Sequence, residues 1–365
     1  MKQTKILFLA MSFAHRNAIL GFNLLSRQRS RRSFFCSQSN YDESSKSNHV
    51  LRRIFVDTPV LCQSSRIELS VEQGHHLSSV LRMRSGELIR VFNGRDGEWL
   101  ASLQPASPEN TVDRQKPRSG RIRKKDAVLL VAADKSCLRP QPYNEIHATL
   151  MFSLIKSKQV RLVVEKATEL GVTSIRPVVS ERVQQGRTLG VDVEMTKLLA
   201  VATNAAEQSE RLTIPSIEPL QTLSEALCSI AAAPCSGPRA LFICEERSDT
   251  SIPLLDALDE MAEQFTSKPF ESEPSDGIFQ RAQIEPIFLV GPEGGWAEGE
   301  VGRAIEALNT AIEVGSALSN SDTYAPTLQV WRVSLGSGIL RAETASLMVL
   351  SVWNAYCAKR NTKKH

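Results

Sequence analysis

The stretch Pro286-Ile287-Phe288-Leu289-Val290-Gly291-Pro292-Glu293-Gly294-Gly295 decides the fold. Its residues 287–290 are four consecutive apolar residues between proline and glycine, a pattern typical of a strand buried on both faces of a parallel sheet. Gly291, Gly294 and Gly295 then permit a sharp turn, because glycine accepts positive φ and leaves the backbone open to a ligand. From Ala297 to Leu308 apolar residues recur at helical spacing, so the sequence predicts a strand, a glycine loop and a helix.

The glycine loop lacks the usual phosphate-binding patterns. It contains neither Gly-Lys-Ser/Thr nor Gly-x-Gly-x-x-Gly, and Glu293 places a carboxylate where a phosphate would be repelled. The loop therefore suits a neutral or cationic ligand. Taken alone, it also fits a tight turn that only closes a core strand.

Four other segments share a known pattern with this loop. They are Val333-Ser334-Leu335-Gly336-Ser337-Gly338-Ile339-Leu340-Arg341-Ala342-Glu343-Thr344-Ala345, Glu165–Val172, Ala206–Arg211 and His76–Glu87. Together they resemble the motifs of the ribosomal RNA small subunit methyltransferase E family, within the SPOUT class of RNA methyltransferases. That family's pattern is close to GPEGG followed by LGxRILRxETA, and the resemblance extends from Arg52 to Tyr356.

The resemblance implies an α/β fold: a SPOUT-type knotted domain with a mostly parallel sheet, preceded by a small PUA-like β-barrel. The residues agree with this division. Short alternating segments around the turn at 93–97 predict a β domain over 52–126, with a helix at Gly74–Met83 that carries Arg82 and Arg84 outward. Alternating strand and helix patterns follow over 127–358, beginning with the strands Ala127–Ala133 and His147–Ile155.

The resemblance also implies the ligands. S-adenosylmethionine is the expected cofactor, and N3 of a uridine in small-subunit (16S-type) ribosomal RNA is the expected acceptor. The residues expected at the cofactor are Leu289, Gly291, Pro292, Glu293, Gly294, Gly295, Leu335, Gly336, Ile339 and Leu340. Glu293 could attract the cationic sulfonium or cap the following helix.

The acceptor nitrogen sets the chemical requirement. Uridine N3 carries a proton and becomes nucleophilic only when that proton leaves, so the site must stabilise the anion or supply a base. Arg341 suits the first task as a permanent cation with a planar donor fork. Glu343 is the candidate base, although an acid in the first turn of a helix also fits the helix dipole. Arg82, Arg84 and Arg211 are the candidate RNA contacts.

Two departures from the family pattern stand out. Gly338 replaces the arginine that follows LGx, and extra residues at Ser316–Trp331 precede the second loop. They leave two alternatives to the uridine-N3 enzyme: a catalytically weakened RNA-binding or ribosome-assembly factor, and a SPOUT ribose 2′-O-methyltransferase.

Composition indicates where the protein works. Residues 1–41 contain no acid but seven Lys or Arg residues and several serines, a composition typical of a transit peptide, so the first 45 residues are set apart from the fold. A chloroplast is preferred over a mitochondrion, and a secretory signal is the competing interpretation. The net charge of +4 hides a basic run over Pro105–Lys125 that could contact RNA phosphates or be a solvated loop.

Other sequence features point away from metals and membranes and toward self-association. The seven cysteines form no C-x-x-C pair, and His75 and His76 are expected to be exposed, so no metal site is predicted. No apolar run reaches the roughly 18 residues that cross a bilayer. The apolar stripe of the last helix, Arg341–Tyr356, is expected to pack in the core and partly to form the seam of a homodimer, which the resemblance also implies.

Overall fold

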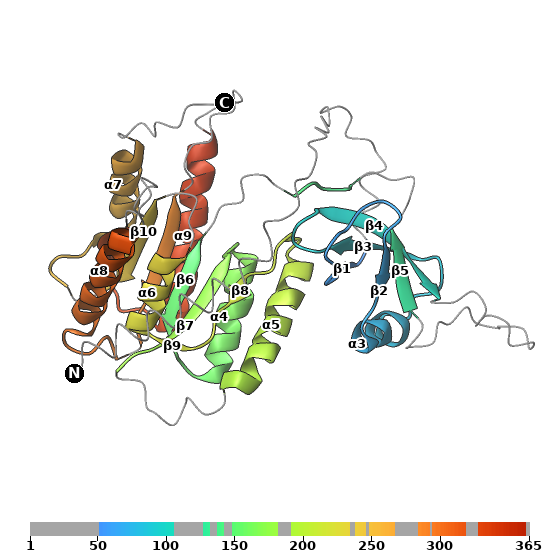
Figure 1. Cartoon of the computed structure of the whole chain (residues 1–365), viewed down its shortest axis with the longest axis horizontal. Helices are drawn as coiled ribbons and strands as arrows, with labels where there is room; N and C mark the ends of the chain where they lie inside the picture. Colours follow the sequence, from blue (N-terminus) through green and yellow to red (C-terminus); the bar gives the residue numbers. More distant parts are fainter. Residues whose placement is uncertain are drawn as a thin grey trace, which may run out of the picture. The chain divides into compact units, whose positions relative to one another are not determined.

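The computed structural model describes residues 51–105, 127–131, 137–141, 148–181, 191–233, 238–245, 248–266, 284–292, 294–318 and 328–362 (Figure 1). The expected transit peptide and most of the basic run lie outside these residues. The strands are β1 (Arg53–Phe55), β2 (Arg66–Glu68), β3 (Leu88–Phe92), β4 (Glu98–Pro105), β5 (Ala127–Val131), β6 (Thr149–Ser153), β7 (Ser174–Val179), β8 (Ser216–Ile217), β9 (Gln221–Thr222), β10 (Arg239–Cys244), β11 (Ile252–Pro253), β12 (Glu285–Val290) and β13 (Leu328–Ser334). The helices are α3 (Val71–His75), the π-helical turn η2 (His76–Val80), α4 (Ser157–Glu169), α5 (Val191–Gln208), α6 (Leu223–Ala232), α7 (Leu254–Thr266), α8 (Glu300–Leu318) and α9 (Ala342–Thr362).

The first sheet has the strand order β1-β3-β4-β5-β2 and encloses its own apolar core. β1 runs parallel to β3, and the other neighbours are antiparallel. Because β5 pairs with both β4 and β2, the predicted boundary at residue 127 is wrong for this strand. Ala127–Val131 closes the first sheet and does not begin the second.

The helix predicted at Gly74–Met83 begins and ends earlier than expected. Ser70 and Gln73 form a reciprocal capping box that starts α3 at Val71. The helical segment stops at Val80, and Arg82 has a φ of 56°, which ends helical geometry. Arg82 and Arg84 are exposed as predicted, but they lie on the loop after the helix.

The second sheet confirms the predicted parallel α/β domain. Its order is β11-β13-β10-β12-β6-β7-β8, β9 also pairs with β7, and every pairing is parallel. Helices cover both faces: α4, α7 and α9 contribute to one apolar cluster, and α6 and α8 to the other (Figure 1). All six residues of β10 are buried, as expected for a central strand. The knot stays a prediction from the resemblance.

The last helix, α9, packs part of its apolar stripe into the core. Trp353 and Tyr356 are 7% and 8% exposed within the single chain, which confirms the expected core packing of the apolar stripe at these two residues. Trp353 lies near Phe288 of β12, and the Tyr356 hydroxyl donates to the carbonyl of Leu258 at 2.9 Å. Met348 is 37% exposed and remains available to a partner.

The extra segment Ser316–Trp331 is partly built into regular structure. Its first three residues complete α8, and its last four begin β13. Residues 319–327 lie outside the described part. Across the described ranges, none of the helices combines the length and apolar character needed to span a bilayer.

Phe288 provides a test of this core. Its ring is fully buried and stacks 5.4 Å from that of Phe242. We expect Phe288→Ala to lower the free energy of unfolding by about 3–5 kcal/mol, because it removes apolar contacts and leaves a cavity. Leu255→Ala, at a position of α7 that is 55% exposed, is the control and should cost about 0.5 kcal/mol or less. Urea unfolding measures both, and equal losses would contradict the assigned core.

Candidate active site at two glycine loops

The two predicted loops leave the same edge of the second sheet. Cys244 of β10 pairs with Val290 on one side and with Val333 on the other. Val290 is the last residue before the first loop, and Val333 lies two residues before the second loop. Since neighbouring strands lie about 4.8 Å apart, the two loops start roughly 10 Å from each other. This is the carboxyl edge of a parallel sheet, where ligands bind in open α/β folds.

The first loop combines one close packing contact with open backbone. A Cβ at Gly291 would lie 2.9 Å from Nε1 of Trp296, so this glycine is required by packing within the chain. Gly294 and Gly295 have no heavy atom within 4 Å of a Cβ position, and both are exposed. Gly295 has a positive φ, 73°. Glu293 lies outside the described residues.

A buried carboxylate anchors this loop. Glu300, only 5% exposed, accepts the backbone N–H of Ala297 at 2.9 Å and that of Glu181 at 2.8 Å. Glu181 follows β7, and its own carboxylate pairs with Arg303 at 2.6 Å. The predicted helix therefore begins at Glu300, three residues later than expected, and its first residue ties the glycine loop to the end of a second strand.

The second loop presents an open backbone followed by a cation. Leu335 is buried, whereas Ile339 is 64% exposed. Gly336 has a φ of 133°, and neither it nor Gly338 has a heavy atom within 4 Å of a Cβ position. Arg341 is exposed at the start of α9, where its carbonyl accepts the N–H of Ala345 at 2.8 Å. Residues 335–341 contain no other Lys or Arg.

Two buried polar atoms beside these loops have no hydrogen-bond partner among the described residues. They are Oε2 of Glu343 and Nε1 of Trp296. A buried polar atom without a partner costs free energy, so such atoms often mark a place where a ligand completes the hydrogen bonding. Sequence reasoning named Glu343 and missed Trp296, because an aromatic residue after a glycine loop looks like ordinary core packing.

The predicted RNA contacts are not gathered at these loops. Arg82 and Arg84 lie in the first sheet's domain, and Arg211 follows α5. The guanidinium of Arg211 lies against Gly171 and donates to the Thr213 hydroxyl at 3.2 Å. The RNA role of these arginines stays a prediction.

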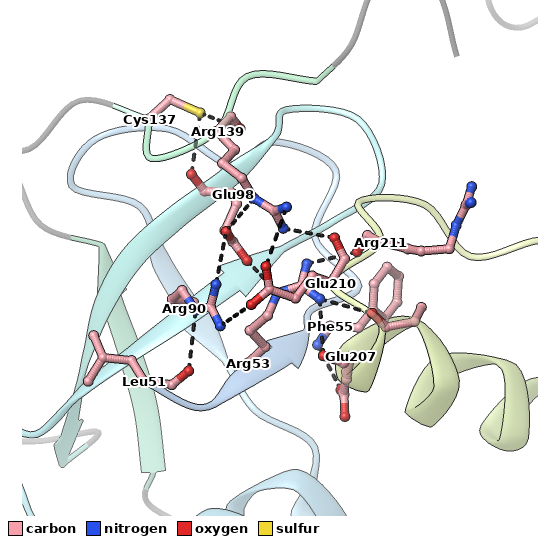
Figure 2. Close-up of polar contacts among 11 residues, drawn as sticks. Leu51, Arg53, Phe55, Arg90, Glu98, Cys137, Arg139, Glu207, Glu210 and Arg211 are labelled. Atoms are coloured by element: carbon pink, nitrogen blue, oxygen red, sulfur yellow. Dashed lines mark hydrogen bonds and ion pairs between the residues drawn. The ribbon is translucent and has the colours of Figure 1, made fainter. Parts of the chain in front are cut away.

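Segment Ala206–Arg211, in contrast, contacts the first sheet. Figure 2 shows Arg53 of β1 directed at its carbonyl groups and Glu207 directed at Phe55. Burial raises the pKa of Glu207, while a hydrogen bond from Arg90 lowers the pKa of Glu210. No motif in the sequence indicated that Arg53 contacts the end of α5.

A separate groove of about 420 Å³ is formed by other elements. It is lined by Ile54, Glu72, Gln73, His76, Thr196, Leu199, Ala200, Thr203, Asn204 and Glu207. None of these residues belongs to the glycine loops, and two carboxylates in the lining disfavour a phosphate. His76 is exposed as predicted. Within the described ranges no three His, Cys, Asp or Glu side chains are grouped as metal ligands would be.

Comparisons with known proteins agree with this architecture. Residues 142–323 match the model of an RNA methyltransferase domain, and residues 69–111 match that of an RNA methyltransferase PUA domain. The chain is 27% identical to the ribosomal RNA small subunit methyltransferase E of Rickettsia conorii over 82% of this chain and 93% of that protein. It is 26% identical to the protein of the same name from Synechocystis, over 86% and 80%.

A solved structure shares the fold. The ribosomal RNA small subunit methyltransferase E of Neisseria gonorrhoeae, crystallised with S-adenosyl methionine, superposes with a TM-score of 0.56 at 24% identity, covering 84% of this chain and 98% of that one. The matched domains, their order and the two relatives lead to one conclusion. The chain belongs to the ribosomal RNA small subunit methyltransferase E family.

Proposed function

We propose that this protein transfers the methyl group of S-adenosylmethionine to N3 of a uridine in small-subunit ribosomal RNA. The observation that carries the proposal is the placement of both glycine loops at one sheet edge, on either side of β10. The relatives from Rickettsia and Synechocystis are named for small-subunit ribosomal RNA, and the neisserial structure contains the cofactor. The choice of uridine N3 rests on the resemblance of the motifs.

The loops fit the cofactor through their open backbone. Side chains are absent at Gly294, Gly295, Gly336 and Gly338, where a Cβ would have no neighbour within 4 Å. With no side chain in the way, a ligand such as an adenosine can approach the backbone of these loops closely. The cofactor supplies a methyl group on a positively charged sulfur, an electrophile that needs no metal.

Arg341 is proposed to stabilise the acceptor. When the N3 proton of uridine leaves, negative charge spreads onto the two uracil oxygens, and a guanidinium can donate to them. Because Gly338 stands where the family pattern has an arginine, Arg341 carries this task without a second cation in its loop.

Glu343 is proposed to receive the proton. Its buried Oε2 has no partner within the described residues. The residue follows Arg341 by two positions and lies in the first turn of α9. In the balanced reaction the N3–H bond breaks toward the carboxylate, N3 bonds the methyl carbon, and the carbon–sulfur bond breaks. The products are neutral N3-methyluridine and a neutral thioether.

RNA binding, self-association and location complete the proposal. Exposed Arg82 and Arg84, with Arg211 and the basic run at 105–125, are proposed to contact RNA. A homodimer is proposed in which exposed Met348 of α9 contributes to the seam. The acid-free N-terminal segment supports import into a chloroplast or mitochondrion.

Gly294→Val tests cofactor binding. The new side chain meets open space in the chain, so the thermal midpoint should match that of the unaltered protein, whereas the ligand's space is filled. We expect the affinity for S-adenosylmethionine in calorimetry to fall more than about a hundredfold, or about 2.7 kcal/mol. Gly302→Ala, at an equally open position of α8, is the control and should bind normally. Normal binding by Gly294→Val would remove this loop from the site.

Arg341→Gln tests the stabilisation of charge. We expect kcat to fall by roughly 10²–10³, the cost of removing one donor that acts on transition-state charge, with cofactor affinity unchanged. Arg161→Gln, at an exposed position of α4, should leave kcat unaltered. A loss confined to RNA affinity would make Arg341 a binding residue.

Nucleoside mass spectrometry tests the reaction itself. Small-subunit ribosomal RNA from cells that lack this protein should lose N3-methyluridine, and the purified protein with S-adenosylmethionine should restore it. Appearance of 2′-O-methyluridine would identify the ribose enzyme. An unchanged nucleoside profile together with defective subunit assembly would identify an RNA-binding assembly factor. Gly338, in place of the family arginine, is the reason that this is the second candidate.

A further inference from the structure

A set of five charged side chains, three of them buried, lies between the first sheet and the end of α5. It comprises Arg53 of β1, Arg90 of β3, Glu98 of β4, Arg139 and Glu210, here called the junction cluster (Figure 2). The Arg53, Arg90 and Glu98 side chains are 2%, 6% and 1% exposed. Glu98 contacts all three arginines, with Arg139 Nε at 2.8 Å from its Oε2.

The cluster holds the C-terminal end of α5 through the backbone. Arg53 donates to the carbonyls of Ala206 at 2.9 Å, Glu207 at 3.1 Å and Arg211 at 2.7 Å. Arg139 donates to the carbonyl of Glu210 at 2.9 Å. The last carbonyls of a helix have no partner inside the helix, so an arginine from another domain that satisfies several of them fixes the helix end.

Glu210 occupies a position where glycine is usual. The N–H of Arg211 donates to the carbonyl of Ala206 at 3.1 Å, which makes Glu210 the residue just past the helix end, and its φ is 58°. A residue with a side chain is strained there. The strain is offset by ion pairs to Arg90 at 2.8 Å and to Arg139 at 3.8 Å. A strained residue that is held by contacts across domains points to a role beyond ending the helix.

The covalent connection between the domains is fastened at the same place. Residues 132–148 connect β5 to β6, and the Glu98 N–H donates to the carbonyl of Arg139 at 2.8 Å. The carbonyl of Glu98 accepts the N–H of Leu138 at 2.8 Å. Glu98 therefore contacts the connector and the first sheet directly, and Arg53, its ion-pair partner, contacts the end of α5.

We propose that the junction cluster holds the PUA-like sheet in one orientation against α5, and so sets which nucleotide of a bound RNA reaches the glycine loops. Its members are positioning residues, since they contact protein and not the reacting atoms. The inference rests on the proposed function: one RNA must contact exposed groups of the first domain and the loops of the second, and free rotation between them would lower the population that engages both.

Arg53→Lys and Glu210→Gly each alter one member of the junction cluster and leave the other four in place. Arg53→Lys keeps a charge for Glu98 but loses the planar fork that serves three carbonyls. Glu210→Gly removes both ion pairs and relieves the positive φ. Glu165→Gln, which removes an exposed pair to Lys166 on α4, is the matched control.

The amide of Phe55 reports directly on the junction. Phe55 lies on β1, the edge strand of its sheet, and its N–H donates to Glu207 Oε1 at 2.9 Å. We expect hydrogen exchange at this amide to accelerate by about tenfold in Glu210→Gly and more in Arg53→Lys, with exchange in β10 unchanged. An unchanged rate at Phe55 in both variants would overturn the claim that the cluster holds the two domains together.

Kinetics then test the effect on RNA. In both variants the KM for small-subunit ribosomal RNA should rise about tenfold, while kcat at saturating RNA and the affinity for S-adenosylmethionine stay within about threefold. Faster exchange at Phe55 with an unaltered KM would overturn the positioning role and leave the proposed function intact. Absence of methylation by the unaltered protein would instead refute the proposed function, and the exchange measurement would still decide whether the cluster holds the junction.

Discussion

Parallel pairing of β10 with two neighbours is the interaction on which the candidate site depends. Residues 239–244 pair with 285–290 on one side and with 328–333 on the other, in the same direction and with matched ends. Because all three strands finish at one edge, the segments that follow β12 and β13 must emerge together. Glycines at this edge leave the backbone without side chains. The apolar faces of the three strands pack against helices on both sides of the sheet, and this packing fixes the edge.

The site is built with few charged side chains. The Glu300 carboxylate accepts two backbone N–H groups beside the first loop. Arg341 is the one Lys or Arg in the sequence of the second loop. Such a division suits a ligand that carries its own positive charge, since fixed cations close to it would oppose binding. In the proposed reaction, Gly338 in place of the family arginine leaves Arg341 as the one cation of this loop.

The junction cluster follows a different physical principle. Buried charges are costly unless each is paired and hydrogen-bonded, and replacing them with apolar residues often stabilises a protein. Here the arginines satisfy helix carbonyls as well as carboxylates, so they determine direction and distance in a way that an apolar contact could not. The same sequence motif, Ala206–Arg211, that marks the family thus contributes its backbone to the contact between the domains.

The sequence alone determined the local elements and the family. An apolar run between proline and glycine located β12, and helical spacing located α8 and α9, because these signals depend on neighbours a few residues apart. Only the tertiary structure decided that β5 belongs to the first sheet, that Trp353 and Tyr356 are covered within one chain, and that Arg53 faces α5. Each of these depends on residues far apart in sequence, and strand alternation or helical periodicity gives a side chain's face but not the partner that covers it.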